Sequence, residues 1–446
     1  MSKETLFELP ASEERPTPAR TGREEARVVR PKREQLQWAP VDLESLVSQE
    51  HPARAIWGFL EKLDLSAFYE PIKAVVDRPG RPSTDPQVLL ALWLLATVEG
   101  IGSARRLARL CEEHDAYRWM RGHAPINYHM LSDFRVAHQE ALDDLLVQII
   151  GSLMAAGAVT LERVAQDGMR VRASAGAASF RRRERLEVCL EEARVQVAQL
   201  AQEREHPDPG VSQREQRARE RAARERQERV EQALAYLPQV QESKERQQTT
   251  YSKVERAKVT APRTSTTDPE ARVMKMPDGG FRPAYNVELA TDSAKGIIVG
   301  VAVTSAGTDA GQAAPMEAQV VKRTGQHPKS YLMDGGFATR EDITALEQRS
   351  VTVYAPVRLP RNKPEEERYQ PRYGDGPEVA RWRQRMSTEE AKAVYRQRGS
   401  MAEWTNAQVR LHGVSQFSVR GLAKVTSVML LIAVAHNLLR WGTLMA

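Results

Sequence analysis

The chain has 446 residues, 41% of them hydrophobic, which is enough for two or three domains with a sizeable core. Its 65 Lys and Arg outnumber 59 Asp and Glu, and the formal charge of +6 favours a polyanionic partner without identifying one. Two distant cysteines, Cys111 and Cys189, support neither a disulfide framework nor a zinc-thiolate site and indicate a reducing cytoplasm. The longest apolar stretch, near 425–434, is predicted to be too short to span a bilayer, so no membrane role is expected.

The N-terminal part divides into a polar arm and a helical region. Residues 1–40 are rich in Pro, Glu and Arg with little apolar periodicity, which predicts a disordered basic arm. Residues 41–157 show helical spacing of apolar side chains and predict an all-α domain. Within it, a buried helix over 87–99 and a basic helix over 104–113 flank a glycine-containing turn, which resembles a helix-turn-helix. An ordinary helical hairpin with a solvated arginine face fits this pattern equally well.

Basic side chains make this helical domain a candidate DNA-binding surface. Three arginines of the second helix recur at helical spacing, and a fourth lies in the turn-rich stretch before the first helix. Arginine donates charge-assisted hydrogen bonds to phosphate groups. We therefore predict DNA contacts at Arg81, Arg105, Arg106 and Arg109.

From residue 158 onward the pattern changes to short β-type runs, and two of these runs lead to an aspartate. A strand over 163–165 precedes Asp167, and a strand over 330–333 precedes Asp334, which Thr339 follows as the cap of a helix. The carboxyl ends of strands in open α/β sheets hold side chains rigidly and leave them accessible to solvent. An aspartate before glycine is more often a turn residue. Two such carboxylates at strand ends nevertheless predict a metal site.

A long charged segment interrupts the β pattern between the two aspartates. Residues 180–250 are dense in Arg, Glu and Gln, with leucines and valines at helical spacing, and predict two long exposed helices inserted in the sheet domain. After this insertion, a hairpin turn over 277–281 and runs over 285–292 and 297–303 predict adjacent antiparallel strands. A helix is predicted over 309–323. The whole pattern describes a mixed sheet with helices packed on it.

Near the C-terminus, residues 395–410 predict a helix that carries a third carboxylate, Glu403. Side chains three, four and seven residues apart lie on one face of a helix, so Glu403 lies on or near a face with basic and polar side chains. Such an acidic residue is usually part of an ion pair, but a third carboxylate is what the two aspartates lack for a magnesium site. Glu403 is therefore a candidate catalytic and metal-binding residue. The helix also contains the predicted DNA contacts Tyr395, Arg398, Asn406 and Arg410.

Taken together, these motifs resemble an insertion-sequence DNA transposase of the Asp-Asp-Glu type. The resemblance covers roughly residues 45–440 and rests on Asp167-Gly168, the segments 265–272, 280–286 and 334–337, and the set from Tyr395 to Arg410. The family places Tyr, Arg, Glu and Lys at fixed spacing. This chain has one extra residue between Arg398 and Glu403, and it has Arg410 where lysine is usual.

The resemblance implies an α+β fold, with an all-α N-terminal DNA-binding domain followed by an RNase H-like mixed β-sheet domain over 158–446 that contains the long helical insertion. It further implies a protein that binds the ends of an insertion sequence and catalyses strand cleavage and strand transfer. Asp167, Asp334 and Glu403 would hold two Mg²⁺ ions, which Mn²⁺ can replace. The partners would be double-stranded element ends and target DNA, bound by a homodimer in the nucleoid-associated cytoplasm of a bacterium.

Two other classes of protein stay open at this point. A metal-dependent DNA nuclease of the same RNase H-like fold would share the acidic triad, but it would not need an end-recognition domain over 41–157. An inactive transposase-derived DNA-binding protein would be expected to have lost a carboxylate, and none is missing. A tyrosine recombinase that uses Tyr395 is disfavoured, because it would need dispersed basic residues and no acidic triad.

Overall fold

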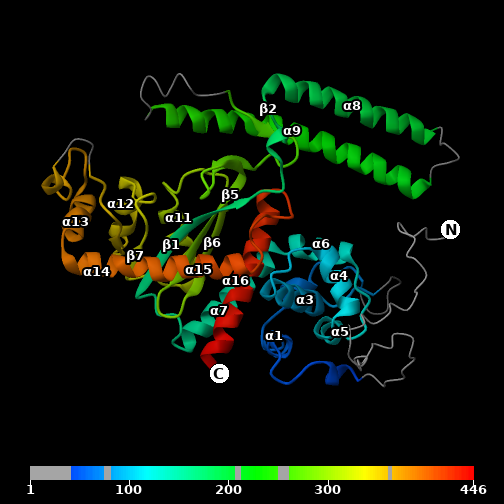
Figure 1. Cartoon of the computed structure of the whole chain (residues 1–446), viewed down its shortest axis with the longest axis horizontal. Coiled ribbons are helices and arrows are strands. Elements are labelled where there is room, and N and C mark those ends of the chain that lie inside the picture. Colours follow the sequence, from blue (N-terminus) through cyan, green and yellow to red (C-terminus); the bar gives the residue numbers. More distant parts are fainter. Residues whose placement is uncertain (1–41, 75–81, 206–211, 250–260, 360–363, 446) are drawn as a thin grey trace, which may run out of the picture. The chain divides into compact units, whose positions relative to one another are not determined.

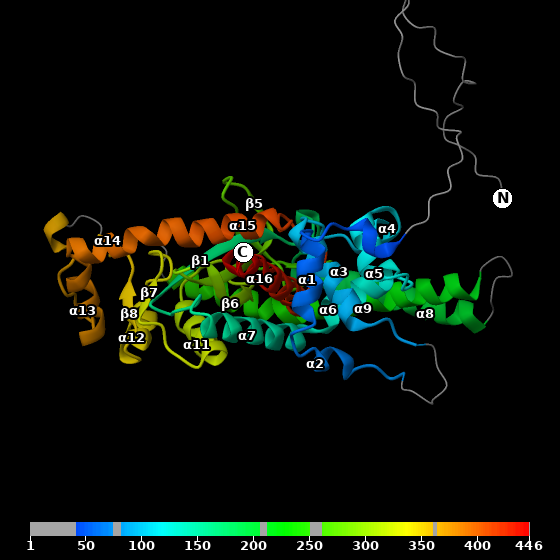
Figure 2. The same cartoon turned by 90° about the horizontal axis from the view of Figure 1, so that it is seen from below.

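The computed structural model describes residues 42–74, 82–205, 212–249, 261–359 and 364–445, and Figures 1 and 2 present it in two views. Two predictions lie outside the described residues: the arm over 1–40 and the DNA contact at Arg81. From Leu43 onward the chain forms one compact unit.

The first part of this unit is helical, as the apolar spacing predicts. Its helices are η1 (Leu43–Leu46), α1 (Pro52–Leu60), α2 (Ser66–Tyr69), α3 (Pro86–Val98), α4 (Ala104–Glu113), α5 (Asp115–Arg121), α6 (Tyr128–Ala137) and α7 (Gln139–Ala155). Because α3 is apolar on every side, nearly all of it is buried. Helix α4 begins at the cap Ser103, whose side chain accepts a hydrogen bond from Arg106 N, and it buries Leu107 and Cys111. The two helices around the glycine-containing turn are therefore confirmed.

The second part contains a mixed sheet of β1 (Arg163–Arg172), β4 (Arg272–Lys275), β5 (Phe281–Asp292), β6 (Ile297–Thr304), β7 (Ser330–Leu332) and β8 (Thr352–Tyr354). The order is β4-β5-β1-β7-β8, and β6 also pairs with β5. Strand β5 is antiparallel to β1, β4 and β6. Strand β7 lies between β1 and β8 and is parallel to both. The predicted hairpin between β4 and β5 and the antiparallel pair β5–β6 are both present.

The helices of this part are α11 (Ala313–Thr324), α12 (Arg340–Gln348), η3 (Glu365–Glu367), α13 (Pro377–Met386), α14 (Glu389–Arg398), α15 (Trp404–Leu411) and α16 (Leu422–Met445). Thr339 caps α12 as predicted, since its hydroxyl oxygen accepts a hydrogen bond of 3.0 Å from Asp342 N. The prediction that a helix begins at Asp309 is wrong. Asp342 accepts hydrogen bonds from Gly311 N and Ala314 N, so α11 begins at Ala313 and Asp309 lies in the loop before it.

Helix α16 joins the two parts in one core. It packs against α3, α6 and α7 of the helical part and against β6 of the sheet. Its apolar stretch is longer than the sequence analysis supposed: Leu422–Thr443 is apolar and long enough to cross a membrane, so that prediction was wrong. Because 67% of this stretch is buried inside the protein, its apolar character is accounted for by the core. The helical part and the sheet therefore share one hydrophobic core, although the chain changes from helix to strand near residue 157.

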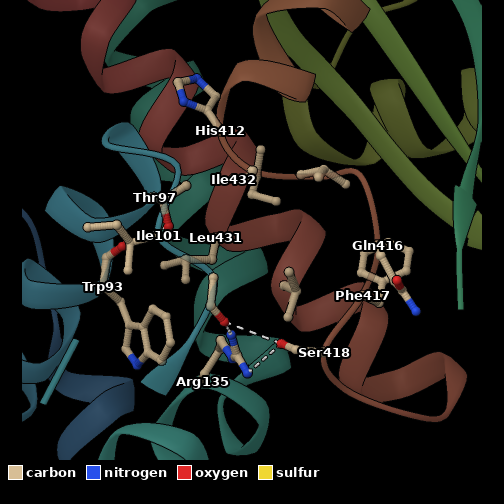
Figure 3. Close-up of a pocket in the computed structure, with 14 residues that line it drawn as sticks. Trp93, Thr97, Ile101, Arg135, His412, Gln416, Phe417, Ser418, Leu431 and Ile432 are labelled. Atoms are coloured by element: carbon tan, nitrogen blue, oxygen red, sulfur yellow. Dashed lines mark hydrogen bonds between the residues drawn. The ribbon is translucent and has the colours of Figure 1, made fainter. Parts of the chain in front are cut away.

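A buried arginine links the helical part to the loop before α16 (Figure 3). Arg135 donates hydrogen bonds to Gly102 O at 2.6 Å and Ser418 Oγ at 3.2 Å, and its guanidinium lies 4.4 Å from the centre of the Trp93 ring. Burial lowers the pKa of Arg135 to about 10. The cavity beside it has a volume of about 40 Å³, close to the space that one water molecule takes up. This cavity lies where the helical part packs against the loop before α16.

The insertion consists of two long helices, α8 (Arg183–Glu205) and α9 (Gln213–Thr249), which lie side by side in both views (Figures 1 and 2). They share a small apolar core of Leu186, Val230, Ala233 and Leu237. At its base, β2 (Phe180–Arg181) pairs with β3 (Thr264–Ser265), and Thr264 donates a hydrogen bond to Ala233 O. The insertion leaves the sheet after β1 and returns before β4.

Candidate active site

Strands β1 and β7 bring the two predicted aspartates together. Their parallel register pairs Val164 with Tyr331 and Ala165 with Leu332. Continued by two residues, the same register places Asp167 opposite Asp334. Burial raises the pKa of the Asp167 carboxyl, Arg398 opposes that rise, and the negative charge of Asp334 adds to it.

Asp167 does not end its strand, which corrects the strand-end position predicted for it. Strand β1 continues to Arg172 because β5 pairs with it from Val164 to Arg172, so Asp167-Gly168 is not a turn. The parallel pairing with β7 stops at Ala165. On that side of β1, the backbone at Asp167 has no strand partner, and the carboxylate lies at the end of the parallel part of the sheet.

A clamp from the C-terminal helices holds both oxygens of Asp167. Arg398 Nη2 lies 2.8 Å from Asp167 Oδ1, and Asn406 Nδ2 lies 2.8 Å from Asp167 Oδ2. Both side chains were predicted as DNA contacts, yet the structure directs them to this carboxylate, and Asn406 is only 6% exposed. The Asn406 Oδ1 atom is buried and has no hydrogen-bond partner among the described residues.

The extra residue between Arg398 and Glu403 is taken up by a π turn, Gly399–Glu403, between α14 and α15. A π turn is closed by i→i+5 hydrogen bonds and so contains one residue more than an α-helical turn. Because the π turn takes up the one extra residue, Arg398 and Glu403 are still about one helical turn apart. Figure 1 shows α14 and α15 as one continuous helical run across the sheet near β1 and β7. The π turn itself contacts β1 and β5.

Glu403 is exposed on this π turn, next to Ala402, which packs against Ala165 of β1. Within the described part of the chain, no hydrogen bond or ion pair joins Glu403 to Asp167 or Asp334. In the same part of the chain, no three His, Cys, Asp or Glu side chains are spaced as a ready set of metal ligands. The convergence of Glu403 with the two aspartates thus stays a prediction.

Two further carboxylates, Glu288 on β5 and Asp309 before α11, belong to this site, and the sequence analysis missed both. Asn286 Nδ2 donates to Glu288 Oε1 at 2.6 Å and to Asp309 Oδ1 at 2.8 Å. The register places Glu288 directly opposite Gly168. The polar residues Asn286 and Glu288, two apart and set among apolar residues of the same run, could have indicated Glu288. No sequence signal indicates Asp309, because a loop holds it.

The glycines that follow the two aspartates make room for these carboxylates. A Cβ atom on Gly168 would lie 3.0 Å from Glu288 Oε1 and 3.2 Å from Asp309 Oδ1. A Cβ atom on Gly336 would lie 2.8 Å from Asp334 Oδ1 and 3.1 Å from Asp309 Oδ2. Any other residue at either position would crowd the acidic oxygens.

The cluster is electrostatically unfavourable as it stands. Glu288 is fully buried, and this burial, followed by the charges of Asp309, Asp167 and Asp334, raises its pKa to about 8. Its hydrogen bonds from Asn286 and Gln166 do not offset that cost. At neutral pH, Glu288 therefore keeps its proton.

Replacement of Glu288 by Gln should stabilise the protein in alkaline solution. The unfolded carboxyl ionises above its ordinary pKa of 4.5, whereas the folded one keeps its proton until about pH 8, so the wild type loses stability between these two pH values. Gln imitates the protonated acid, so the variant should gain on the order of a few kcal/mol at pH 8.5 and nothing at pH 4.5. Thermal melts at both pH values measure this, with the exposed Glu341→Gln as control. A variant no more stable than wild type at pH 8.5 would contradict it.

Within the described residues, no hydrogen bond joins the remaining predicted residues to the carboxylates. Tyr395 is half-buried, and burial raises the pKa of its hydroxyl, which neighbours Arg398. Arg410 is exposed on α15. Arg358, which the sequence analysis did not single out, is exposed with its Nε 3.6 Å from the Cβ position of Gly335. The α4 arginines, Arg105, Arg106 and Arg109, are exposed, and none forms a salt bridge within the described residues.

Comparison with known protein families gives two matches. Residues 41–137 match the transposase domain DUF772, and residues 366–441 match the transposase DDE domain. No curated protein and no solved structure matches the chain. The second segment contains Glu403 and the clamp residues Arg398 and Asn406, whereas both aspartates lie between the two segments. Both matches are to transposase domains, and together they support an insertion-sequence transposase of the DDE type.

Proposed function

We propose that this transposase cleaves the DNA strands at the ends of its element and joins them to target DNA at a centre formed by Asp167, Asp334 and Glu403. The observation that carries the proposal is the parallel pairing of β1 and β7, whose register, continued by two residues, sets Asp167 opposite Asp334. Arg398, which lies in the segment that matches the DDE domain, donates to Asp167. Water would attack the phosphodiester first, and the freed 3′-hydroxyl would then attack the target.

The fold of this centre is proposed to be RNase H-like, with the helical insertion between its first strand and the later ones. Its support is the strand order β6-β5-β1-β7-β8, in which β5 is antiparallel to both β6 and β1, and β7 and β8 run parallel to β1. In such a sheet, the carboxylates of β1 and β7 meet at the same end.

The donor set fits Mg²⁺, with Mn²⁺ as a substitute. Carboxylate oxygens are hard ligands, and Mg²⁺ keeps several waters, so few protein ligands are needed. The spaces beside Gly168 and Gly336 lie against acidic oxygens, and the orphaned Asn406 Oδ1 belongs to a side chain that contacts Asp167. Asp167, Asp334 and Glu403 would hold the ions. When bound, two such ions activate the attacking oxygen and stabilise the leaving one in an in-line displacement at phosphorus.

Other side chains orient this centre and bind phosphate. Arg398 and Asn406 fix the Asp167 carboxylate from two sides, so its direction is set before substrate arrives. The exposed guanidinium groups of Arg410 and Arg358 are suited to grip phosphates near the scissile bond. Two copies of the chain would hold the two ends of the element, on the bacterial DNA in the cytoplasm.

The helical part, 41–157, is proposed to recognise the element ends through α4. Arg105→Ala should weaken end binding and reduce its dependence on salt, because one phosphate contact is lost. Arg105 lies over the Tyr128 ring at 5.1 Å, at the surface and away from the carboxylates. Gel-shift titrations at several salt concentrations measure the change, and manganese binding should be unaltered. An unchanged affinity and salt slope would exclude Arg105 from the DNA interface.

The test of the proposed function is incubation of the full chain with DNA that carries the ends of its own element and Mg²⁺. The expected products are 3′-hydroxyl ends and DNA joined to a target. Cleavage without any joining would favour a nuclease. Specific binding without cleavage in either metal would favour an inactive DNA-binding protein.

A further inference from the structure

We propose that Asp309 is a further ligand of the divalent cation, beside Asp167 and Asp334. This inference rests on the proposed function and deepens it. Nothing in the acidic triad of the family assigns a role to Asp309, which is supplied by the loop between β6 and α11.

The position of Asp309 between the two aspartates carries the proposal. Its Oδ1 lies against the space beside Gly168, the residue after Asp167, and its Oδ2 lies against the space beside Gly336, which Asp334 Oδ1 also borders. Asp309 is thus the one described carboxylate with an oxygen beside each of the two glycines. Its charge also acts on the Asp167 carboxyl. A cation between the aspartates would come within reach of Asp309.

One carboxylate oxygen of Asp309 accepts a hydrogen bond within the described residues, and the other does not. Asn286 Nδ2 donates to Oδ1, and within the described residues no protein donor bonds to Oδ2. A partly exposed carboxylate with one oxygen held and the other facing a like-charged neighbour lacks a positive partner. The Oδ1 atom of the buried Asn406, whose Nδ2 donates to Asp167, is a second polar atom near this site that has no hydrogen-bond partner among the described residues. A cation beside Asp167 would supply the positive partner that Asp309 Oδ2 lacks.

Two other carboxylates are less suited to this place. Glu288 shares the Asn286 amide, but it is fully buried and keeps its proton at neutral pH. Glu403 is exposed and, among the described residues, forms no hydrogen bond or ion pair with either aspartate. Asp309 is thus placed to complete a set of three aspartates.

The experiment measures manganese binding directly, without DNA or turnover, by electron paramagnetic resonance of free Mn²⁺ titrated into the full chain. Asp309→Asn should raise the dissociation constant about tenfold or more, because it removes one anionic oxygen and keeps the shape. Asp144→Asn, an exposed aspartate on α7, is the matched control and should bind as wild type does. An unchanged dissociation constant for Asp309→Asn would overturn the proposal.

Thermal melts separate a ligand from a merely structural residue. A ligand variant loses a repulsive charge, so without metal it should melt at or above the wild-type temperature, while the rise in melting temperature caused by Mn²⁺ shrinks. If Asp309 only held its loop through Asn286, the variant would melt lower with and without Mn²⁺, and the shift caused by Mn²⁺ would be unchanged. That second result would also overturn the proposal.

Asp167→Asn and Asp334→Asn, measured in parallel, keep this inference separate from the proposed function. If both weaken manganese binding and Asp309→Asn does not, the inference about Asp309 fails alone. If none of the three variants alters binding, the proposed metal centre fails with it.

Discussion

Asp334→Asn is expected to reduce strand cleavage by about three orders of magnitude or more, while the protein still binds the ends of its element. The substitution keeps the volume of the side chain and removes the anionic oxygen that would hold a metal against the reacting phosphate. Binding of the ends depends on the helical part and its arginines, so it should persist and weaken with added salt as in the wild type.

The assay follows 3′-hydroxyl ends and joined products with Mg²⁺ and with Mn²⁺, next to gel shifts with the same DNA. Asp144→Asn, on the far helix α7, controls for the loss of one surface carboxylate. Equal cleavage by wild type and Asp334→Asn would remove Asp334 from the catalytic centre. Loss of both cleavage and folding, seen in the melting profile, would call for the same test on Asp167→Asn.

Deletion of Ser400 is expected to lower cleavage by about a hundredfold or more. The side chain of Ser400 is exposed, and the hydrogen bond that it forms is a donation from its hydroxyl group to Gln397 O. Removal of one residue converts the π turn into an α-helical turn and rotates α14 by roughly 100° relative to α15. Either the hydrogen bond between Arg398 and Asp167 would then be lost, or α14 would no longer pack against the sheet. Misplacement of a catalytic group by about 1 Å already costs on the order of a hundredfold in rate.

Ser400→Ala is the matched control, because it changes the side chain and keeps the count of residues in the turn. It should cleave at close to the wild-type rate. Cleavage by the deletion variant at the wild-type rate would mean that the π turn does not set the positions of Arg398 and Glu403. Melting profiles of both variants report whether a loss of cleavage reflects unfolding.

Local patterns were enough to predict most elements of this chain. The apolar spacing of α3, the cap at Thr339 and the hairpin before β5 depend on residues close in sequence, and each was predicted correctly. The start of α11 was not, because the carboxylate that fixes it, Asp342, belongs to a later helix. The apolar stretch near 425–434, judged too short to span a bilayer, is part of the longer apolar segment Leu422–Thr443 of α16, most of which is buried in the core.

For the candidate site, the sequence by itself determined which residue types were available: two aspartates followed by glycine and a helix with an arginine, a glutamate and an asparagine. Only the tertiary structure decided their neighbours. The parallel register of β1 and β7 sets Asp167 opposite Asp334, and long-range packing turns Arg398 and Asn406 onto Asp167 instead of toward solvent. Asp309 and Glu288 join the cluster through one amide, Asn286, whose contacts span a strand and a loop. Such proximities depend on how strands and loops pack across the fold, which residue spacing along the chain does not specify.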